Sequence, residues 1–159
     1  MTFQIKAIQA PDHSKISEIV NELWGNEIII VHGDIFHTLI LKGLKALIDD
    51  QIIGFFHYQR RNKECEILTL ASLKERQGVG SALTEAVEKI AREDSCRVLS
   101  VITINDNLHA LGFYQRRGNH LAALYPGSVN ASKKKPTIPD TGDNNIPIRD
   151  ELRLEKLLS

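Results

Sequence analysis

The feature that most constrains the fold is a strand, helix, strand pattern in the middle of the chain. The apolar, partly alternating run Glu64–Leu70 predicts a strand, and apolar residues at three- and four-residue steps predict a helix from Gly78 to about Glu93. The run Arg97–Ile104 is apolar enough to predict a buried strand. Two strands joined by one helix make a crossover, which is expected to be right-handed with parallel strands. The pattern therefore predicts an α/β fold.

Further elements are expected on both sides of this unit. Upstream, the patterns predict an amphipathic helix, a short strand and two strands that form an antiparallel hairpin: Ser14–Trp24, Ile28–Val31, Leu44–Ile48 and Ile52–Tyr58. The stretch Gly33–Leu41 shows no clear pattern. Downstream, they predict a helix that Asp106 caps and Gly118 ends, a strand, a long loop suspected of a functional role and an edge or closing strand: Leu108–Arg117, Leu121–Tyr125, Pro126–Pro147 and Asp150–Leu158.

Composition limits the class of protein. With 159 residues and 42% hydrophobic content, residues 1–159 are expected to form a single domain with its own core. Twenty basic residues balance twenty acidic ones, so bulk charge favours neither nucleic acid nor a membrane surface. The two cysteines form no CxxC or Cys/His cluster, no apolar signal-like or membrane-spanning run is visible, and His32, His37 and His57 lack metal spacing. We expect a reduced, cytoplasmic, soluble protein without a metal.

Two glycines one residue apart, Gly78 and Gly80, stand where the central helix begins. Bare backbone at a helix start allows close approach of a ligand, and the N–H groups and the helix dipole favour an anion such as phosphate. Taken alone, the same glycines also suit a simple turn that packs against a strand. No Lys-Ser/Thr follows the second glycine and no third glycine completes a dinucleotide fingerprint, so neither ATP nor NAD is indicated.

The surrounding motifs extend this signal. The glycine pair lies between a strand and a helix, the next strand ends in "NDN", and the following helix carries "NLHALGFYQRRG". In this order the chain resembles the GCN5-related N-acetyltransferases, whose phosphate loop reads Gln/Arg-x-x-Gly-x-Gly/Ala and whose later helix opens Asn-x-x-Ala and carries a tyrosine. The matching positions are Glu75, Gly78 and Gly80, then Asn107, Ala110 and Tyr114. The resemblance covers roughly residues 43–158, and the tail is similar to that of small bacterial members.

The resemblance implies a mixed central sheet of about six to seven strands with a splayed parallel pair, flanked by helices, and acetyl-CoA as cosubstrate. It implies that cofactor contacts come from the backbone of the strand before the loop, from the loop with the helix start, and from the later asparagine: Leu68, Leu70, Arg76, Gln77, Gly78, Val79, Gly80, Ser81 and Asn107. The first loop position, usually Gln or Arg, is Glu75, a carboxylate that must turn outward so that backbone donors carry the contact.

The resemblance also implies catalytic roles for two side chains. Tyr114 would protonate the departing thiolate, and Glu66 would act as general base toward an amine whose ammonium form has a pKa near 10.4. The expected activity is acetyl transfer to a primary amine of a small molecule or protein. A non-catalytic acyl-CoA-binding module is the alternative, and zero net charge with 6% aromatic content disfavours a nucleic-acid-binding domain. The acceptor's identity and a homodimer through exposed strand edges stay open.

Overall fold

The computed structural model of the chain describes residues 2–24, 28–74, 76–129 and 139–158. The described residues form nine strands and three α-helices, with short 3-10 helices at Ala10–Asp12 and Thr38–Ile40. In chain order they are β1 (Gln4–Ala7), α1 (His13–Trp24), β2 (Ile28–Val31), β3 (Asp34–His37), β4 (Lys42–Ile48), β5 (Gln51–Arg61), β6 (Glu64–Ser72), α2 (Val79–Glu93), β7 (Val98–Ile104), α3 (Leu108–Arg116), β8 (His120–Tyr125) and β9 (Glu151–Leu157). None of the helices built from these residues is long and apolar enough to cross a membrane.

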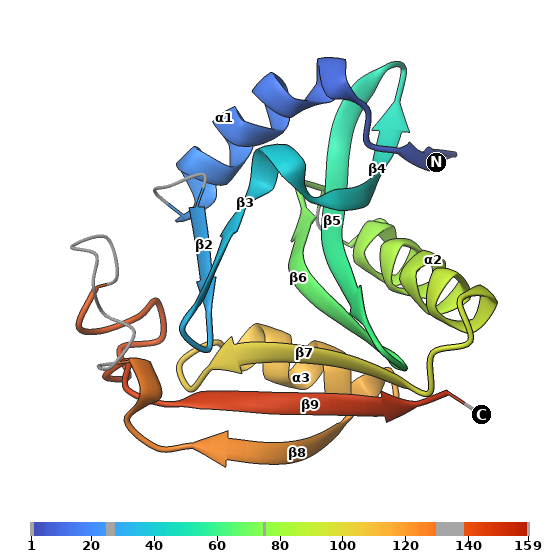
Figure 1. Cartoon of the computed structure of the whole chain (residues 1–159). Helices are drawn as coiled ribbons and strands as arrows, with labels where there is room; N and C mark the ends of the chain where they lie inside the picture. The colour runs from blue at the N-terminus through green and yellow to red at the C-terminus, as the bar shows by residue number, and fades with distance from the viewer. Residues whose placement is uncertain (1, 25–27, 75, 130–138, 159) are drawn as a thin grey trace.

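Seven strands form one sheet in the order β1-β4-β5-β6-β7-β9-β8, while β2 and β3 pair separately as an antiparallel hairpin (Figure 1). Within the large sheet, the β6–β7 pair is parallel and the other neighbours described are antiparallel. These pairings confirm the predicted mixed sheet, its parallel pair joined through α2, and the antiparallel hairpin of β4 and β5.

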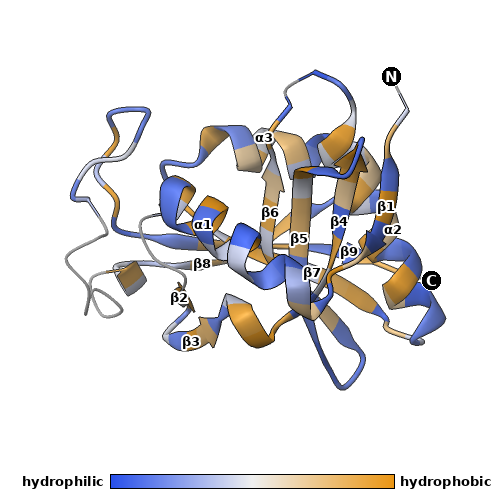
Figure 2. Ribbon diagram, turned by 90° about the horizontal axis from the view of Figure 1, so that it is seen from above, coloured by the Kyte–Doolittle hydropathy of each residue, from blue (hydrophilic) through white to orange (hydrophobic). Residues whose placement is uncertain are grey.

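The core is divided between the two faces of the sheet because consecutive strand residues point to opposite sides. Phe56 points to the face covered by α2 and α3, where it shares a buried cluster with Leu83 and Tyr114. Phe55 points to the other face and packs with Val20 of α1 in a second cluster. The β2–β3 hairpin and α3 therefore lie on opposite sides of the sheet (Figure 2).

Three features differ from the sequence-based expectations. β1 was not predicted, because four residues on a sheet edge are too short to display a period. The stretch 33–41 contains β3, which pairs with β2 around a turn in which His32 and Gly33 have φ values of 48° and 85°. The last strand was expected as an edge or closing strand; β9 lies inside the sheet, between β7 and β8, and β8 is the edge strand.

Asp106 does not cap α3, contrary to expectation. The Asn107 side chain is the cap, since its Oδ1 accepts from the Ala110 N–H at 3.2 Å. The buried Asp106 carboxylate instead accepts the backbone N–H groups of Asn144 at 3.3 Å and Ile146 at 3.0 Å. The part of the 126–147 loop that includes Asn144 and Ile146 is therefore held against the turn between β7 and α3.

Gly54 of β5 lies where α2 begins, and this contact leaves no room for a side chain. A Cβ added there would lie 2.7 Å from Val79 Cγ1 and 2.8 Å from the Ala71 carbonyl oxygen. Because such overpacking moves backbone and helix together, we expect Gly54→Ala to lower the free energy of unfolding by roughly 1–3 kcal/mol. Urea denaturation followed by circular dichroism measures this change.

The matched control is Gly112→Ala in α3. Its added Cβ would meet the flexible end of Arg116, at 2.9 Å from Nη1, and alanine favours a helix over glycine by roughly 1 kcal/mol. We expect this variant to be at least as stable as the wild type. Equal stability of Gly54→Ala and the wild type would contradict the tight packing of α2 on β5.

Candidate functional site

The parallel pairing of β6 with β7 stops partway along both strands. It runs from Glu64 opposite Val98 to Ile67 opposite Val101, and among the described residues the segment 68–72 keeps β5 as its one strand neighbour. A bulge coincides with this break, because Ile67 pairs with Tyr58 and Thr69 with His57, which leaves Leu68 as an extra residue. Bulges bend a strand and end its pairing. The β7-facing backbone edge of Leu68–Ser72 is thus available to an extended ligand.

The start of α2 lies directly after this edge and suits an anion. Gly78 is the N-cap residue in a left-handed conformation, φ 78°, and a Cβ there would meet nothing within 4 Å. No side chain of the described residues caps the helix, and its first turn carries no acidic residue. Val79 is buried, while Arg76, Gln77 and Gly78 are exposed. Open space, free N–H groups and the positive helix pole fit a pyrophosphate.

Glu75, the position that departs from the family motif, lies outside the described residues, as does the lysine run 133–135. Leu68 is 8% exposed and Leu70 is half-buried against the α2-side cluster, so both side chains serve packing while their backbone follows the open edge.

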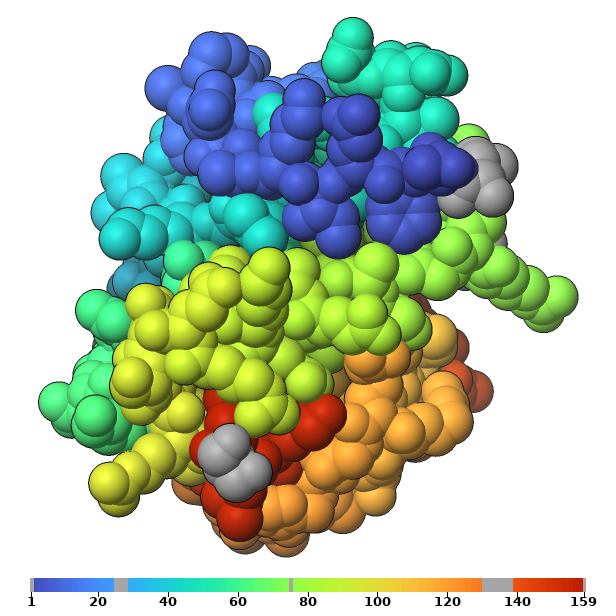
Figure 3. All heavy atoms as spheres, turned by 90° about the vertical axis from the view of Figure 1, so that its right-hand side faces the viewer, coloured from blue at the N-terminus to red at the C-terminus, as the bar shows by residue number. Residues whose placement is uncertain are grey.

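The helices α2 and α3 begin at the same end of the sheet, because each follows one of the two parallel strands. A Cβ at Gly80 would lie 3.5 Å from the Phe113 ring, and Arg117 forms an ion pair with Glu85 at 3.6 Å. Figure 3, viewed toward α2, shows its yellow-green surface lying directly against the orange surface of the segment that follows β7. The fold therefore brings the open edge, the glycine loop and α3 together on one face of the sheet.

Tyr114 of α3 lies on this same face. Its side chain is 4% exposed, shares the large buried cluster and packs edge-on against Phe113 with ring centroids 5.2 Å apart. Burial raises the pKa of the Tyr114 hydroxyl above its ordinary value of 10.0. The hydroxyl is therefore protonated at neutral pH and is a hydrogen-bond donor. Asn107, seven residues earlier, caps α3 with its side-chain oxygen Oδ1, which leaves its side-chain amide N–H groups to donate to another partner.

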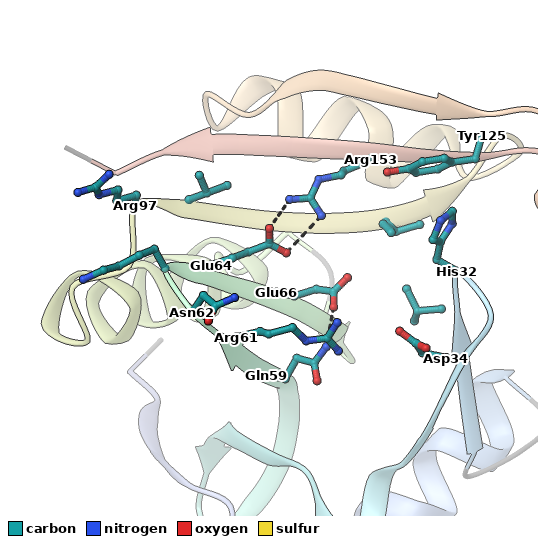
Figure 4. Close-up of a pocket in the computed structure, with 14 residues that line it drawn as sticks. His32, Asp34, Gln59, Arg61, Asn62, Glu64, Glu66, Arg97, Tyr125 and Arg153 are labelled. Atoms are coloured by element: carbon teal, nitrogen blue, oxygen red, sulfur yellow. Dashed lines mark hydrogen bonds and ion pairs between the residues drawn. The ribbon is translucent and has the colours of Figure 1, made fainter.

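Glu66 lies on the opposite face of the sheet from Tyr114. It pairs with Gln59 of β5, whose amide donates to Glu66 Oε1 at 2.9 Å. Both residues line a pocket of about 490 Å³ between the strands and the β2–β3 hairpin (Figure 4). The pocket also contains Asp34, Arg61 and Tyr125, so it combines charged, polar and aromatic side chains.

A hydrogen-bonded ion pair crosses the floor of the pocket. Arg153 of β9 donates to Glu64 at 2.5 and 3.2 Å and to Glu155 at 2.8 Å, and the Ser100 hydroxyl donates to Glu64 at 3.0 Å. Burial raises the pKa of Glu64, but the bonds from Arg153 and Ser100 outweigh it and hold that pKa below its ordinary value. These contacts join β6 to β9 across β7 where the parallel pairing is intact.

The tip of the β2–β3 hairpin closes one side of the pocket. The His32 backbone N–H donates to the Glu151 carboxylate at 3.0 Å, and the His32 ring lies 4.1 Å from the Tyr125 ring. Because Glu151 belongs to β9 and Tyr125 to β8, the hairpin reaches from the α1 side of the molecule to its C-terminal strands. The hairpin tip thereby confines this side of the pocket.

A second polar feature lies under α1. His57 is fully buried, with Nδ1 at 2.7 Å from the Thr69 hydroxyl, and its Nε2 has no hydrogen-bond partner among the residues that the structure describes. His13 Nδ1 and Ser17 Oγ of α1 are also buried and have no hydrogen-bond partner within the described part of the chain. The desolvation of the ring, with a smaller contribution from His13, lowers the pKa of His57 to about 4.

The cysteines are free and buried. Burial raises the pKa of the Cys65 thiol to about 12 and also raises that of Cys96. Neither forms a nucleophilic thiolate at neutral pH. Among the described residues there is no group of three or more His, Cys, Asp or Glu side chains that could hold a metal ion.

Sequence reasoning missed most of the pocket on the Glu66 face. The sequence analysis did not select three residues that line the same pocket as Glu64 and Glu66, namely Gln59, Arg61 and Arg153. Gln59 and Arg61 lie directly opposite Glu66 and Glu64 on the neighbouring strand β5. The alternation of side chains identifies residues on the same face within one strand. The predicted β4–β5 hairpin also gives one neighbouring strand of β5. The placement of β9 next to β7, which brings in Arg153, has no local signal.

Comparison with known proteins relates this geometry to a family. The model of the acetyltransferase (GNAT) family matches residues 10–118. The uncharacterized protein YxbD of Bacillus subtilis is 41% identical over 145 residues, which cover 90% of this chain and 91% of that protein. The uncharacterized protein YdhI of the same organism is 38% identical over 137 residues, 85% of this chain and 86% of the relative.

Solved structures share the fold. A Bacillus subtilis acetyltransferase in complex with CoA superimposes with a TM-score of 0.73 at 18% identity, over 99% of this chain and 100% of that one. A GNAT family acetyltransferase from Elizabethkingia anophelis with acetyl-CoA bound gives a TM-score of 0.72 at 18% identity, over 98% of both chains.

The buried His57 leads to a prediction on pH. The folded-state pKa of His57, about 4, lies below the ordinary value of 6.5. Between these two pH values the imidazole is therefore protonated in the unfolded chain and neutral in the folded one. The stabilising contribution of the neutral ring is complete above pH 6.5 and is lost as the pH falls toward 4. We expect NMR titration to find the His57 imidazole neutral at pH 6, with a parallel loss of unfolding free energy below it. A His57 midpoint near 6.5 would contradict the burial.

Proposed function

Because the chain belongs to the acetyltransferase (GNAT) family, we propose that it transfers the acetyl group of acetyl-CoA directly to a primary amine within one complex that holds both substrates. The observation that carries the proposal is the edge of β6 beyond Ile67, which has no β7 partner among the described residues and lies beside a helix start that none of their side chains caps. The amine belongs to a small molecule or a protein. We further propose one domain over 1–159, supported by β1 and β9 sharing a sheet, and a cytoplasmic location, consistent with two free cysteines.

The proposed cofactor contacts follow the open edge and the helix start. The backbone of Leu68 and Leu70 would bind the pantetheine arm as a neighbouring strand does, and the segment 76–81 would bind the pyrophosphate through its N–H groups. The amide of Asn107 would add a contact from α3. When bound there, acetyl-CoA supplies an acetyl thioester, whose carbonyl carbon is the target of the amine.

Two side chains are proposed to move protons, one from each face of the sheet. Glu66 accepts a proton from the acceptor's ammonium group, directly or through water, so that the nitrogen lone pair is free to attack. Tyr114 donates its proton to the sulfur as the carbon–sulfur bond breaks, and the second proton that the attacking nitrogen loses returns to the tyrosine oxygen. Burial raises the pKa of Tyr114 and so makes it a weaker acid, which means that the donation is driven by the negative charge that develops on the sulfur. The buried, protonated cysteines favour this direct transfer over an acetyl group carried on the enzyme.

The cofactor half of the proposal is tested at Gly80. Its replacement by glutamate puts a carboxylate into the first turn of α2, where the pyrophosphate is expected, so Gly80→Glu should weaken acetyl-CoA binding by roughly tenfold or more in Kd. Calorimetric titration measures this loss. Gly80→Ala is the control, since its Cβ would make ordinary contact with Phe113 at 3.5 Å and adds no charge. Retained affinity in the folded glutamate variant would rule out the phosphate site.

The catalytic half is tested at Tyr114. Tyr114→Phe keeps the buried ring but removes the proton, so we expect kcat to fall by roughly 10²-fold or more while the Kd for acetyl-CoA stays unchanged. Tyr58→Phe, which removes a hydroxyl from a tyrosine of β5 outside the proposed site, should leave kcat unaltered. Thiol release measures turnover. Selective acetyl-CoA binding without any acetylated amine, in the wild type itself, would instead favour a non-catalytic acyl-CoA-binding module.

A further inference from the structure

The pocket around Glu66 has a charge arrangement that bears on the class of acceptor, and the inference drawn from it rests on the proposed function. Its floor consists of two cross-strand pairs of β5 and β6, Gln59 with Glu66 and Arg61 with Glu64. All four side chains reach into the same space (Figure 4). The question is which of these charges are available to a ligand.

Glu64 and Arg153 satisfy each other. Arg153 directs Nη1 and Nη2 at Glu64 and Nε at Glu155, and Glu64 accepts a further bond from Ser100. Side-chain exposures of 17% for Arg153 and 35% for Glu64 keep this network partly shielded from water. A ligand that recruited either group would have to break existing charge-assisted bonds, so both act as structural parts of the floor.

Glu66 is free to bind a cation. Its Oε1 accepts from the neutral Gln59 amide at 2.9 Å, and it forms no salt bridge with any residue that the structure describes. The remaining carboxylate oxygen is therefore available to an ammonium group. Glu66 also lies one residue before Ile67, where the pairing of β6 and β7 ends and the proposed thioester would arrive.

Arg61 is free to bind an anion. It lines the same pocket and forms no salt bridge with a residue that the structure describes; the carboxylate on which its charge acts, Glu64, is already bonded to Arg153. Lys63, the residue before Glu64, and Arg97 also line the pocket and add positive potential to it. Arg61 and Glu66 are diagonal neighbours on paired strands, a relation that separates Cα atoms by about 7–8 Å. One small molecule can reach both.

We propose that the acceptor is a small zwitterion of the amino-acid type, with its ammonium group on Glu66 and a carboxylate on Arg61 a few bonds away. The confinement by the β2–β3 hairpin, whose His32 contacts Glu151 and Tyr125, fits a small molecule better than a protein segment. The carboxylate acts only in binding, whereas the amine is the group acetylated.

The test compares matched amines in thiol-release assays with acetyl-CoA. Glycine, β-alanine, 4-aminobutyrate and 6-aminohexanoate are each paired with the corresponding amide, which keeps the ammonium group and removes the negative charge. For the best pair we expect the zwitterion to exceed its amide by roughly tenfold in kcat/KM, about the factor that one charge-assisted hydrogen bond supplies. Putrescine is included to represent a dicationic acceptor.

Arg61→Gln should reduce this preference to within about threefold, mainly by raising KM for the zwitterion. Arg60→Gln is the matched control. Arg60 is the preceding residue of β5, is also exposed, and pairs with Asp94 at 3.3 Å outside the pocket. We expect it to retain the wild-type preference, which separates a local contact from a general loss of positive charge.

The outcomes distinguish this inference from the proposed function. Amides or putrescine used as well as the zwitterions, or a preference that Arg61→Gln leaves intact, would overturn the zwitterion assignment while acetyl transfer stands. Acetyl-CoA binding without turnover of any zwitterion would overturn it as well. Absence of acetyl-CoA binding would remove the proposed function itself, and the inference with it.

Discussion

Leu68 forms a bulge in β6, because it has no partner in the antiparallel pairing with β5. The parallel pairing of β6 with β7 ends at the preceding residue, Ile67. Before the bulge, Ile67 faces α2 and Glu66 faces the pocket; after it, Thr69 contacts His57 on the α1 side. The same strand thus contributes a carboxylate to one face and a free backbone edge to the opening. The bulge in the β5–β6 ladder thus coincides with the point where β6 and β7 cease to pair.

The two ends of the β6–β7 pair are held by different forces. At the paired end, Glu64, Arg153 and Ser100 join three strands through charge-assisted bonds. At the open end, α2 and α3 pack on each other, with Phe113 beside Gly80, and on the buried cluster that includes Tyr114. Because polar bonds hold the closed end and apolar packing holds the open one, the separation of the strands is built into the native fold rather than requiring a ligand.

The sequence predicted the parts of this arrangement that depend on local periodicity. The crossover from β6 through α2 to β7 and the β4–β5 hairpin were correctly predicted, because their apolar steps repeat over enough residues to define a period. Gly78 and Gly80 at the start of α2 were identified from the order of the motifs, and their role in cofactor binding stays a prediction. β1 and β3 were missed because their four residues mix polar and apolar side chains, QIKA and DIFH, whereas the equally short β2 was found from its uniformly β-branched run IIIV.

Other misses arose from contacts distant in sequence. The prediction that Asp106 caps α3 was wrong, because its carboxylate accepts the backbone N–H groups of Asn144 and Ile146, 38 and 40 residues away in the sequence. The residues near Asp106 in the sequence do not indicate these partners. The placement of β9 between β7 and β8 likewise depends on tertiary pairing. That placement brings Arg153 to Glu64, so the polar floor of the pocket had no signal in local sequence.

Tyr114 and Glu66 lie on opposite faces of the sheet, and this separation restricts how the proposed reaction can occur. A closed sheet would keep a proton donor on the α3 side from a proton acceptor on the hairpin side. Because β6 and β7 cease to pair beyond Ile67, a thioester bound along the β6 edge, as proposed, would meet an amine on Glu66 without the two substrates competing for one cavity. Separate entry supports direct transfer in a ternary complex. It also means that acceptor selectivity can change on the hairpin side, through residues such as Arg61, while the cofactor side stays the same.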